Sequence, residues 1–400
     1  MRFAPQKNVR DPFPGPFAKE IQDDPHPCYR WLREERPVYY NAAGDYWALS
    51  RYADIVAAVR NPADFSSAEG IGPARIVGRA MLTSDPPDHT RLRALVSRAF
   101  QPGVIEALAP RVEAICNELI DASAVARGSF DLMEDFAIPM PIRVIAELIG
   151  LDSSRYSDYR RWTQALVELV SNPDSVESQL KYAVSSREFG AYLLQVGMAR
   201  FRSPRADVLS LLIQARVERD ALTPEEIAYS CELFLAAGSE TTSALIGNAA
   251  VLLAAHPGDY APLLSQPARF HSMIEEVMRY EGPFRGDFRT TTRAVTVHGV
   301  EIPKGAKVAM LLASANRDPT IFPEPERFLI HRSPNPHLGF GHGIHYCLGA
   351  PLARMEARVA AMVLRKRFRH LNPDSRNAVW DSTSPYLRRL NRLPMSYCLS

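Results

Sequence analysis

The chain has 400 residues, 46% of them hydrophobic and 23% charged, which is the composition of a globular protein and excludes a disordered or fibrous one. Its 47 basic and 45 acidic residues leave a formal net charge of +2, so charge gives no support to a nucleic-acid partner. The length allows two ordinary domains or one large one.

The first half of the chain is expected to hold a short helix, a β-hairpin and then a series of helices. A helical pattern occupies residues 29–35. Two strand-like runs, residues 37–40 and Tyr46–Leu49, flank turn residues at positions 43–45 and predict a hairpin. From residue 90 to residue 217 apolar side chains recur at helical spacing, which predicts a run of helices.

A long helix is predicted in the middle of the chain. Thr223 and Glu226 have the spacing of a capping box, and the helical pattern continues to about residue 256. Polar residues interrupt the apolar run at Glu232 and at positions 239–242. A membrane span is therefore a poor interpretation, and we expect a helix through the centre of a globule.

The C-terminal half is expected to mix helices with short strands. One helix ends at Tyr280, strands fit residues 295–302 and 307–312, and a proline-rich meander covers residues 319–336. No repeat or linker is visible. The fold class predicted is mainly α with small β-sheets, in a single domain over residues 1–400.

The cysteines are odd in number, widely spaced and contain no Cys-x-x-Cys pair. They are Cys28, Cys116, Cys231, Cys347 and Cys398. A disulfide framework or structural zinc site is not expected from such spacing, and a reducing cytoplasm fits best. The N-terminus lacks the apolar core of a signal peptide or membrane anchor, so we expect a cytoplasmic protein with no membrane partner.

Cys347 differs from the other four cysteines, which we interpret as small buried hydrophobes. It lies in Phe-Gly-His-Gly-Ile-His-Tyr-Cys-Leu-Gly, the segment from Phe340 to Gly349, just before a helical pattern. Glycines such as Gly341 allow the backbone to approach another group closely, and the positive end of the following helix would stabilise a thiolate.

This segment resembles the haem-binding loop of the cytochrome P-450 family, whose pattern Phe-Gly-x-Gly-x-His-x-Cys-x-Gly it matches. The resemblance implies a helix-rich domain enclosing haem b (iron protoporphyrin IX), with Cys347 as the thiolate ligand of the iron. It also implies that Phe340, Gly341 and Gly349 form the loop around the cofactor and that Phe340 shields the sulfur.

The central helix contains Ala-Ala-Gly-Ser-Glu-Thr-Thr at positions 236–242, which resembles the oxygen-activating segment of that family. The resemblance implies that Gly238 helps to open a groove over the distal face of the haem. It also implies that Glu240 and Thr241 relay protons as the catalytic residues. Without the resemblance, the simpler interpretation is that hydroxyl side chains in the middle of a helix donate a hydrogen bond to a preceding carbonyl group.

Two further sets of residues stand in family order. Glu276 and Arg279 resemble the Glu-x-x-Arg pair of a structural network, with Arg327 or Arg332 as its third member; alone, such a pair is more often solvent-exposed. Four basic residues occupy positions that pair the haem propionates, although each alone is more often an exposed basic residue. These four residues are His89, Arg93, Arg289 and His345. Thr291 is a mild departure, because many relatives have alanine there.

The resemblance implies a soluble bacterial-type monooxygenase that inserts one oxygen atom of O2 into an organic substrate. The sequence contains no dinucleotide fingerprint or ferredoxin-type cysteine cluster, so we expect no fused reductase and a separate ferredoxin or flavodoxin with its reductase. Basic residues at 358 and 365–367 would attract this donor or simply form a solvated helix face. The alternatives are a peroxide-using enzyme, an isomerase, a haem gas sensor or, more remotely, a zinc protein.

The substrate is not identified by the sequence. Phe284 and Phe288 suggest an apolar or aromatic contact, and Arg285 and Asp287 suggest recognition of a charged group. The other candidate pocket walls are residues 66–82 and 382–386 and the helix residues Leu235, Ala236 and Leu245.

Overall fold

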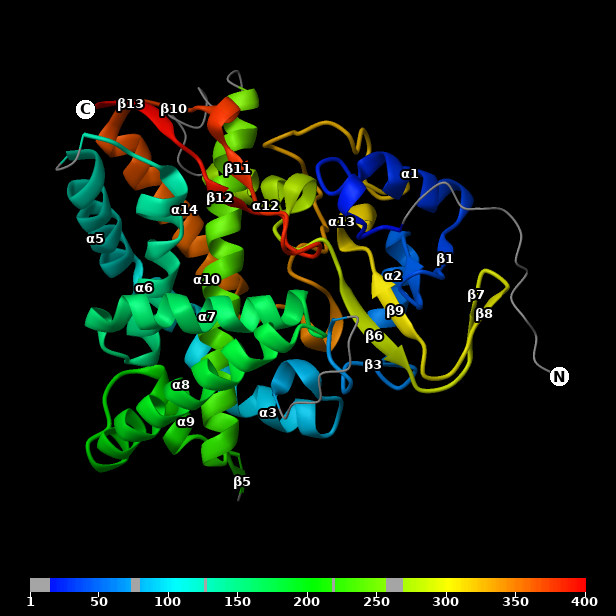
Figure 1. The fold of residues 1–400 in the computed structure, drawn as a ribbon, viewed down its shortest axis with the longest axis horizontal. Coiled ribbons are helices and arrows are strands. Elements are labelled where there is room, and N and C mark those ends of the chain that lie inside the picture. Colours follow the sequence, from blue (N-terminus) through cyan, green and yellow to red (C-terminus); the bar gives the residue numbers. More distant parts are fainter. Residues whose placement is uncertain (1–14, 73–79, 126–127, 218–219, 257–268) are drawn as a thin grey trace.

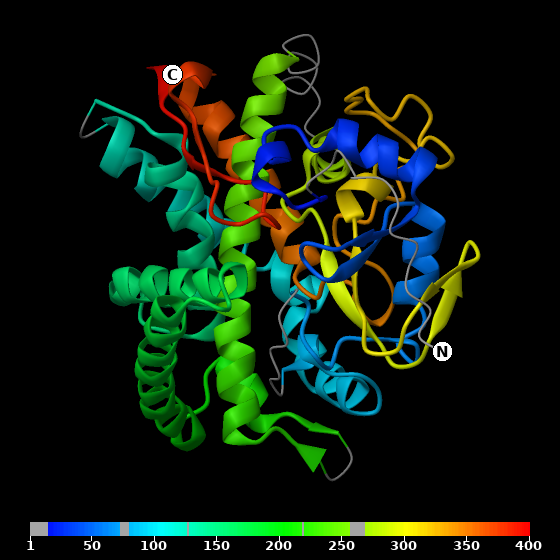
Figure 2. The same cartoon turned by 45° about the vertical axis from the view of Figure 1, so that its right-hand side comes forward.

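A computed structural model describes residues 15–72, 80–125, 128–217, 220–256 and 269–400. Most of the longer helices lie on one side of the long helix α10 (Pro224–Ala255), and the main sheet lies on its other side together with several shorter helices (Figures 1 and 2). The other helices are α1 His26–Glu35, α2 Tyr52–Val59, α3 Asp88–Val96, α4 Pro102–Glu106, α5 Ala109–Ile120, α6 Pro139–Ile149, α7 Tyr156–Ser171, α8 Val176–Arg202, α9 Val208–Gln214, α12 Arg269–Glu281, α13 Leu312–Ala315 and α14 Ala350–Arg367.

The predicted start of α10 is confirmed in atomic detail. The Thr223 hydroxyl oxygen accepts a hydrogen bond from the Glu226 N–H (3.2 Å), and the Glu226 carboxylate accepts one from the Thr223 N–H (2.8 Å). Both bonds satisfy amide groups that lack partners in the first turn of a helix. The helix is packed against α6, α7, α12 and α14. It therefore forms a fixed central axis for the fold.

The main sheet has five strands in the order β1-β2-β9-β6-β3, and only the β2–β9 pair is parallel. Four two-stranded sheets complete the β-structure of the described residues. The strands are β1 Val38–Asn41, β2 Tyr46–Leu49, β3 Phe65–Ser66, β4 Arg216–Val217, β5 Asp220–Ala221, β6 Asp287–Thr291, β7 Val295–Val297, β8 Val300–Ile302, β9 Lys307–Met310, β10 Phe368–Pro373, β11 Val379–Trp380, β12 Leu390–Arg392 and β13 Met395–Leu399.

Both faces of the main sheet are covered by apolar side chains. Val308 and Met310 of β9 pack into a cluster with residues of α2, whereas Ala309 packs into an aromatic cluster on the opposite face. Phe288 of β6 is paired with Ala309 and shares its face. Because side chains alternate along a strand, Asp287 and Arg289 must point to the α2 face.

Most predicted elements are present, with three differences. The hairpin is confirmed as β1 and β2. The strand expected at residues 295–302 is instead the hairpin β7–β8, because His298 and Gly299 both have positive φ and form a turn. The run of helices ends at Gln214, and β4 follows. Strand β6 and the C-terminal strands β10–β13 were not predicted.

Within the described ranges, no helix is both long enough and apolar enough to cross a membrane.

Candidate functional site

The loop around Cys347 is held in place by its own backbone and by α2. The Cys347 N–H donates to the Phe340 carbonyl oxygen (2.9 Å), and the Gly341 N–H donates to that of Leu338 (2.8 Å). Gly343 has a φ of +71°, and a Cβ there would lie 2.7 Å from the Val59 carbonyl oxygen. A larger residue at this position would strain the backbone and collide with α2, so glycine is required.

Two opposing influences act on the pKa of the Cys347 sulfur: burial favours the thiol, and nearby donors favour the thiolate. Burial raises its pKa, while the backbone N–H of Gly349, the positive charges of Arg93 and Arg354 and the N–H of Ala350 lower it. Ala350 is the first residue of α14, so the sulfur lies at the positive end of this helix. The net effect is a raised pKa, because burial is the largest influence, so the thiolate form requires a bound cation to compensate its charge.

Four basic side chains meet beside this loop, although they come from three separate segments. His89 and Arg93 lie on α3, Arg289 on β6, and His345 on a 3-10 turn, Gly343–His345. The rings of His89 and His345 are 4.3 Å apart between centroids. The set that the sequence placed in family order is thus brought together.

The electrostatics of this cluster fit an anionic ligand. Burial lowers the pKa of His345 to about 3, helped by the positive charges of Arg289, His89 and Arg93. The Nε2 atoms of both histidines are buried and have no hydrogen-bond partner in the described structure. Two orphaned imidazole nitrogens beside two guanidinium groups are suited to two carboxylates, so the residues present fit a haem and its propionates.

Thr241 and Gly238 lie in the middle of α10, three residues apart and therefore on neighbouring parts of its surface. The Thr241 hydroxyl donates to the Ala237 carbonyl oxygen (2.7 Å), and the Ala237 side chain is exposed although α10 is central. A Cβ on Gly238 would lie 3.4 Å from the Ile145 side chain of α6. Gly238 thus lies beside α6, and its part in a groove over the haem stays a prediction.

Glu240 is held by a partner that the sequence did not indicate. Its carboxylate is ion-paired with Arg389, whose Nε also donates to Asp381 (2.7 Å). All three side chains are largely buried. A buried acid in an apolar helix was expected to need a partner. Nothing local in the sequence shows that the C-terminal segment supplies it.

The predicted structural network forms a compact buried cluster. Glu276 and Arg279 are joined by two hydrogen bonds of 2.8 Å, and Arg332 Nε lies 3.2 Å from both Glu276 carboxylate oxygens. Arg332 is therefore the third side chain. The Arg327 guanidinium instead pairs with Glu324 at the surface, and only its backbone carbonyl accepts from Arg279 and Arg332.

A second ionic cluster, missed by the sequence analysis, supports the cysteine loop. The Arg354 guanidinium lies over the Phe340 ring, 4.3 Å from its centroid. It also forms bonds of 2.6 and 2.7 Å to the Glu275 carboxylate, which His337 contacts at 3.1 Å. Burial would raise the pKa of Glu275, but these two cationic partners lower it to about 2.

Several predicted pocket walls do not line a shared cavity with Cys347. Phe288 is fully buried in the aromatic cluster formed with Phe17, Tyr46 and Tyr386. Leu235 and Ala236 face a narrow crevice bounded by α7 and α8. The alternation of β6 turns Phe288 into the aromatic cluster, and the role of Leu235 and Ala236 as substrate contacts stays a prediction.

The charged candidates near β6 are also occupied within the protein. Arg285 donates to the backbone carbonyl of Gln22, and Asp287 forms an ion pair of 2.9 Å with Arg289. Phe284 forms a backbone bridge with Leu387 and is partly buried beside the α2 cluster. The structure therefore gives no support to recognition of a charged substrate group. Of the loop 66–82, residues 73–79 lie outside the described part of the chain.

The basic residues expected to attract an electron donor are mostly paired. Arg358 contacts Glu106 (2.7 Å), and Arg367 contacts Asp121 (2.5 Å). Lys366 lies 3.9 Å from Glu113. This face is thus closer to the solvated, ion-paired helix surface that was the alternative interpretation.

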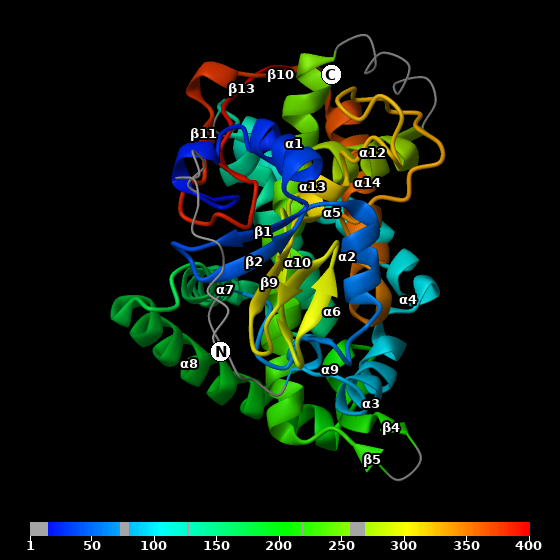
Figure 3. The ribbon, with the colours of Figure 1, turned by 90° about the vertical axis from the view of Figure 1, so that its right-hand side faces the viewer.

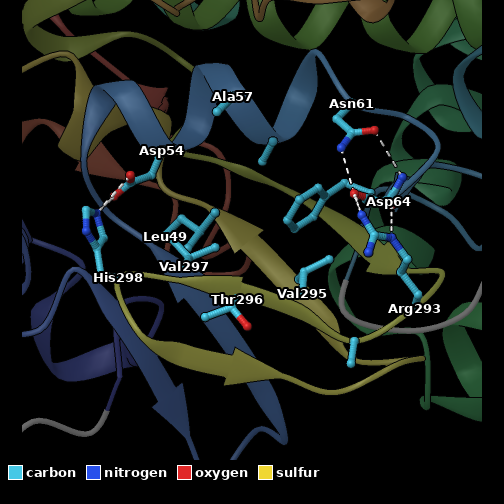
Figure 4. A pocket seen from close by; sticks show the side chains of 13 residues that line it. Leu49, Asp54, Ala57, Asn61, Asp64, Arg293, Val295, Thr296, Val297 and His298 are labelled. Atoms are coloured by element: carbon cyan, nitrogen blue, oxygen red, sulfur yellow. Dashed lines mark hydrogen bonds and ion pairs between the residues drawn. The ribbon is translucent and has the colours of Figure 1, made fainter.

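A hollow of about 630 Å³ opens away from these residues, between α2 and the β7–β8 hairpin (Figure 4). Its ends are closed by the pair His298–Asp54 (2.9 Å) and by Arg293, which forms bonds of 2.6 and 2.8 Å to Asp64. None of the predicted site residues lines it. These ion pairs tie the hairpin to the α2 region.

Within the described ranges, no group of three His, Cys, Asp or Glu side chains that could hold a metal ion is found.

Comparison with known proteins identifies the class to which this fold and site belong. The family model for cytochrome P450 matches residues 270–392. Cytochrome P450 107B1 of Saccharopolyspora erythraea is 38% identical over 402 residues, covering 95% of this chain and 96% of the relative. Cytochrome P450 monooxygenase PikC of Streptomyces venezuelae is 37% identical, covering 96% and 93%. The crystal structure of cytochrome P450 CYP109Q5 from Chondromyces apiculatus superposes with a TM-score of 0.87 at 34% identity, covering 96% and 98%.

The chain belongs to the cytochrome P450 family. It is an oxidoreductase of the monooxygenase class, and membership implies a haem cofactor, O2 and an organic substrate.

Proposed function

We propose that residues 1–400 act as one catalytic domain that binds haem b and oxidises a small to medium organic substrate with O2. Two electrons come from a separate ferredoxin or flavodoxin and its reductase. The observation that carries this proposal is the position of Cys347 at the start of α14, beside a cluster of four basic side chains. No disulfide joins any of the five cysteines, all of which lie in the described ranges, and this supports a reducing compartment such as the cytoplasm.

Cys347 holds the iron as a thiolate in this proposal. When bound, the haem supplies the activation of O2, which no amino-acid side chain provides. The N–H groups of Gly349 and Ala350 and the charge of Arg93 lower the pKa of the sulfur and so oppose the effect of its burial. Phe340 excludes water from the sulfur, because the residue is buried and the Arg354 guanidinium covers its ring.

Arg93, Arg289, His89 and His345 hold the two propionates. Arg289 is fixed by Asp287 and by the Phe288 carbonyl oxygen (2.7 Å), so its guanidinium is already positioned. The histidines donate through the Nε2 atoms that have no other partner in the described structure. Burying these donors without an acceptor would be costly, and two carboxylates remove that cost.

Thr241 and Glu240 control proton delivery. The Thr241 hydroxyl proton is engaged by the Ala237 carbonyl oxygen, which leaves the Oγ1 lone pairs free to accept a hydrogen bond from a water or an acid. Glu240 is an ion pair with Arg389 in this state, so its carboxylate must leave Arg389 before it can carry a proton toward Thr241. Asp381 retains Arg389 during that movement.

We propose a neutral organic substrate. Both charged side chains suggested by the sequence are committed to contacts within the protein, Arg285 to Gln22 and Asp287 to Arg289. A charged substrate group facing these two described side chains would lose its hydration without gaining a free partner from either of them.

The proposal is tested by the spectrum of the haem-loaded, reduced and carbon-monoxide-treated protein. We expect the long-wavelength Soret band of thiolate ligation in the wild type and its loss in Cys347→Ser. Cys398→Ser is the matched control, because that thiol is exposed and remote from the loop in sequence. A wild-type protein that binds haem without this band would refute the assignment. Turnover with reductase and donor, but not with peroxide alone, separates the monooxygenase from a peroxide-using enzyme, an isomerase or a gas sensor.

A further inference from the structure

The outward face of α8 carries an unusual number of exposed apolar side chains. Fourteen large apolar residues are exposed in the described ranges, and six of them lie on this helix. They are Val176, Leu180, Val184, Leu194, Met198 and Phe201. Leu180 is 63% exposed and Phe201 75% exposed. Figure 3 shows α8 along the edge of the molecule, with one long side turned away from the body. Soluble monomers rarely leave so many large apolar side chains exposed along one helix.

The exposed positions have the spacing of a coiled-coil seam. From Leu180 the seam continues at positions 184, 187, 191, 194, 198 and 201, with alternating steps of four and three residues. Arg187 is the charged member of the seam, and Ala191 is the small one. The inward side of α8 is already used, because Phe189 and Leu193 are buried in the main core. The seam is therefore a second apolar face, opposite to the one that holds the helix in the fold.

The seam is complementary to itself in the antiparallel direction. With the centre of α8 on a two-fold axis, Leu180 faces Met198 of the partner subunit, and Val184 faces Leu194 of the partner subunit. The long Arg187 side chain faces Ala191 of the partner subunit, which leaves room for it. The same pairs occur twice, as an isologous interface requires. Parallel packing would instead place Arg187 beside Arg187 of the partner subunit, which like charges disfavour.

Charge and shape at the edges agree with this arrangement. Glu177 and Arg202 lie on the same flank at opposite ends of α8, so antiparallel packing brings Glu177 close to Arg202 of the partner subunit. On the other flank lies Gly190, and a Cβ there would meet nothing within 4 Å. Glycine weakens a helix interior, but it lets a second backbone approach closely. The six large side chains expose on the order of 600 Å² per copy, which approaches the roughly 800 Å² that each partner of a standard interface buries.

We infer that α8 is a homodimerisation surface on which two copies of this chain pack antiparallel along the seam from Leu180 to Phe201. The inference does not depend on the proposed function.

Sedimentation velocity of the haem-loaded protein across the micromolar range tests the inference. The wild type should be a dimer, and Met198→Glu should be a monomer. Met362→Glu is the matched control, because Met362 is also an exposed methionine of a long helix, α14, and this variant should remain a dimer. A wild type that is monomeric throughout would overturn the inference, as would a Met198→Glu protein that stays dimeric. A monomer that binds phosphatidylcholine vesicles through the seam would also overturn it, in favour of a lipid surface.

The direction of packing is tested by distances between spin labels in the dimer, in a Cys398→Ser background. At 1.5 Å per residue, antiparallel packing separates labels at Gln195→Cys by about 18 Å along the axis and labels at Ala199→Cys by about 30 Å. Parallel packing would give nearly the same short distance at both positions. Equal distances at the two sites would refute the antiparallel arrangement.

Discussion

Replacing Glu276 by Gln removes the negative charge that two buried guanidinium groups share. Its carboxylate accepts hydrogen bonds from Arg279 and Arg332, from the Leu329 N–H (2.8 Å) and from Asn335 (3.2 Å). The Glu276 and Arg279 side chains are completely inaccessible to solvent. Breaking a buried pair by removing one partner costs about 3 to 5 kcal/mol, because the remaining charge is left uncompensated. We therefore expect Glu276→Gln to lose that much of its free energy of unfolding.

The chain provides a matched control for this substitution. Glu324 and Arg327 form a pair with the same three-residue spacing, but both side chains are more than half exposed. Exposed pairs contribute about 0.2 to 1 kcal/mol, so Glu324→Gln should be nearly neutral. Guanidinium unfolding of the haem-loaded proteins, followed by circular dichroism, compares the two variants with the wild type. Equal losses in both variants would show that burial of the cluster does not determine its contribution.

Three further predictions concern the proton path, the acid limit of stability and the cysteine loop. Thr241→Ala should lower the amount of product formed per O2 consumed by roughly tenfold or more, because a positioned proton donor is lost. Ser239→Ala is the control: it removes a similar hydroxyl in the middle of the helix and should leave this ratio unchanged. The carboxyl group of Glu275 has its pKa lowered from 4.5 to about 2, which corresponds to roughly 3 kcal/mol of stability that is present above pH 4.5 and lost as the pH falls toward 2. Glu275→Gln should flatten that acid limb in unfolding measured against pH, and an unchanged slope would contradict this assignment. Gly343→Ala should lower the free energy of unfolding by about 1 to 3 kcal/mol and weaken the retention of haem. Gly103→Ala, where a Cβ meets nothing, should change neither quantity. Equal haem loss in both variants would refute the steric argument.

Features set by neighbouring residues were predictable from the sequence. The capping box at Thr223 and the hairpin of β1 and β2 depend on residues a few positions apart, and both were found where expected. The loop of Cys347 was recognisable for the same reason. Its glycines and its position before a helix are local, whereas the contact with α2 that makes Gly343 necessary and the support by Arg354 and Glu275 appear only in the structure.

Features set by distant segments were not predictable. Glu240 was expected to need a partner, but Arg389 lies on a C-terminal strand connection that follows no local rule. Phe288 was misplaced because the direction of a β-strand residue depends on register, and pairing with Ala309 turns it into the aromatic cluster. Arg327 and Arg332 both lie within five residues of prolines in the meander, so the sequence does not distinguish them. Only the backbone conformation of the folded meander determines which guanidinium group reaches Glu276.

The basic cluster and Cys347 come from α3, from β6 and from the segment that precedes α14. The residues that would bind the cofactor are therefore spread over most of the chain. A ribosome-bound intermediate that lacks the last quarter of the protein has neither the sulfur nor His345. Haem acquisition must then be a late event in biogenesis, after the C-terminal segment has been synthesised and folded.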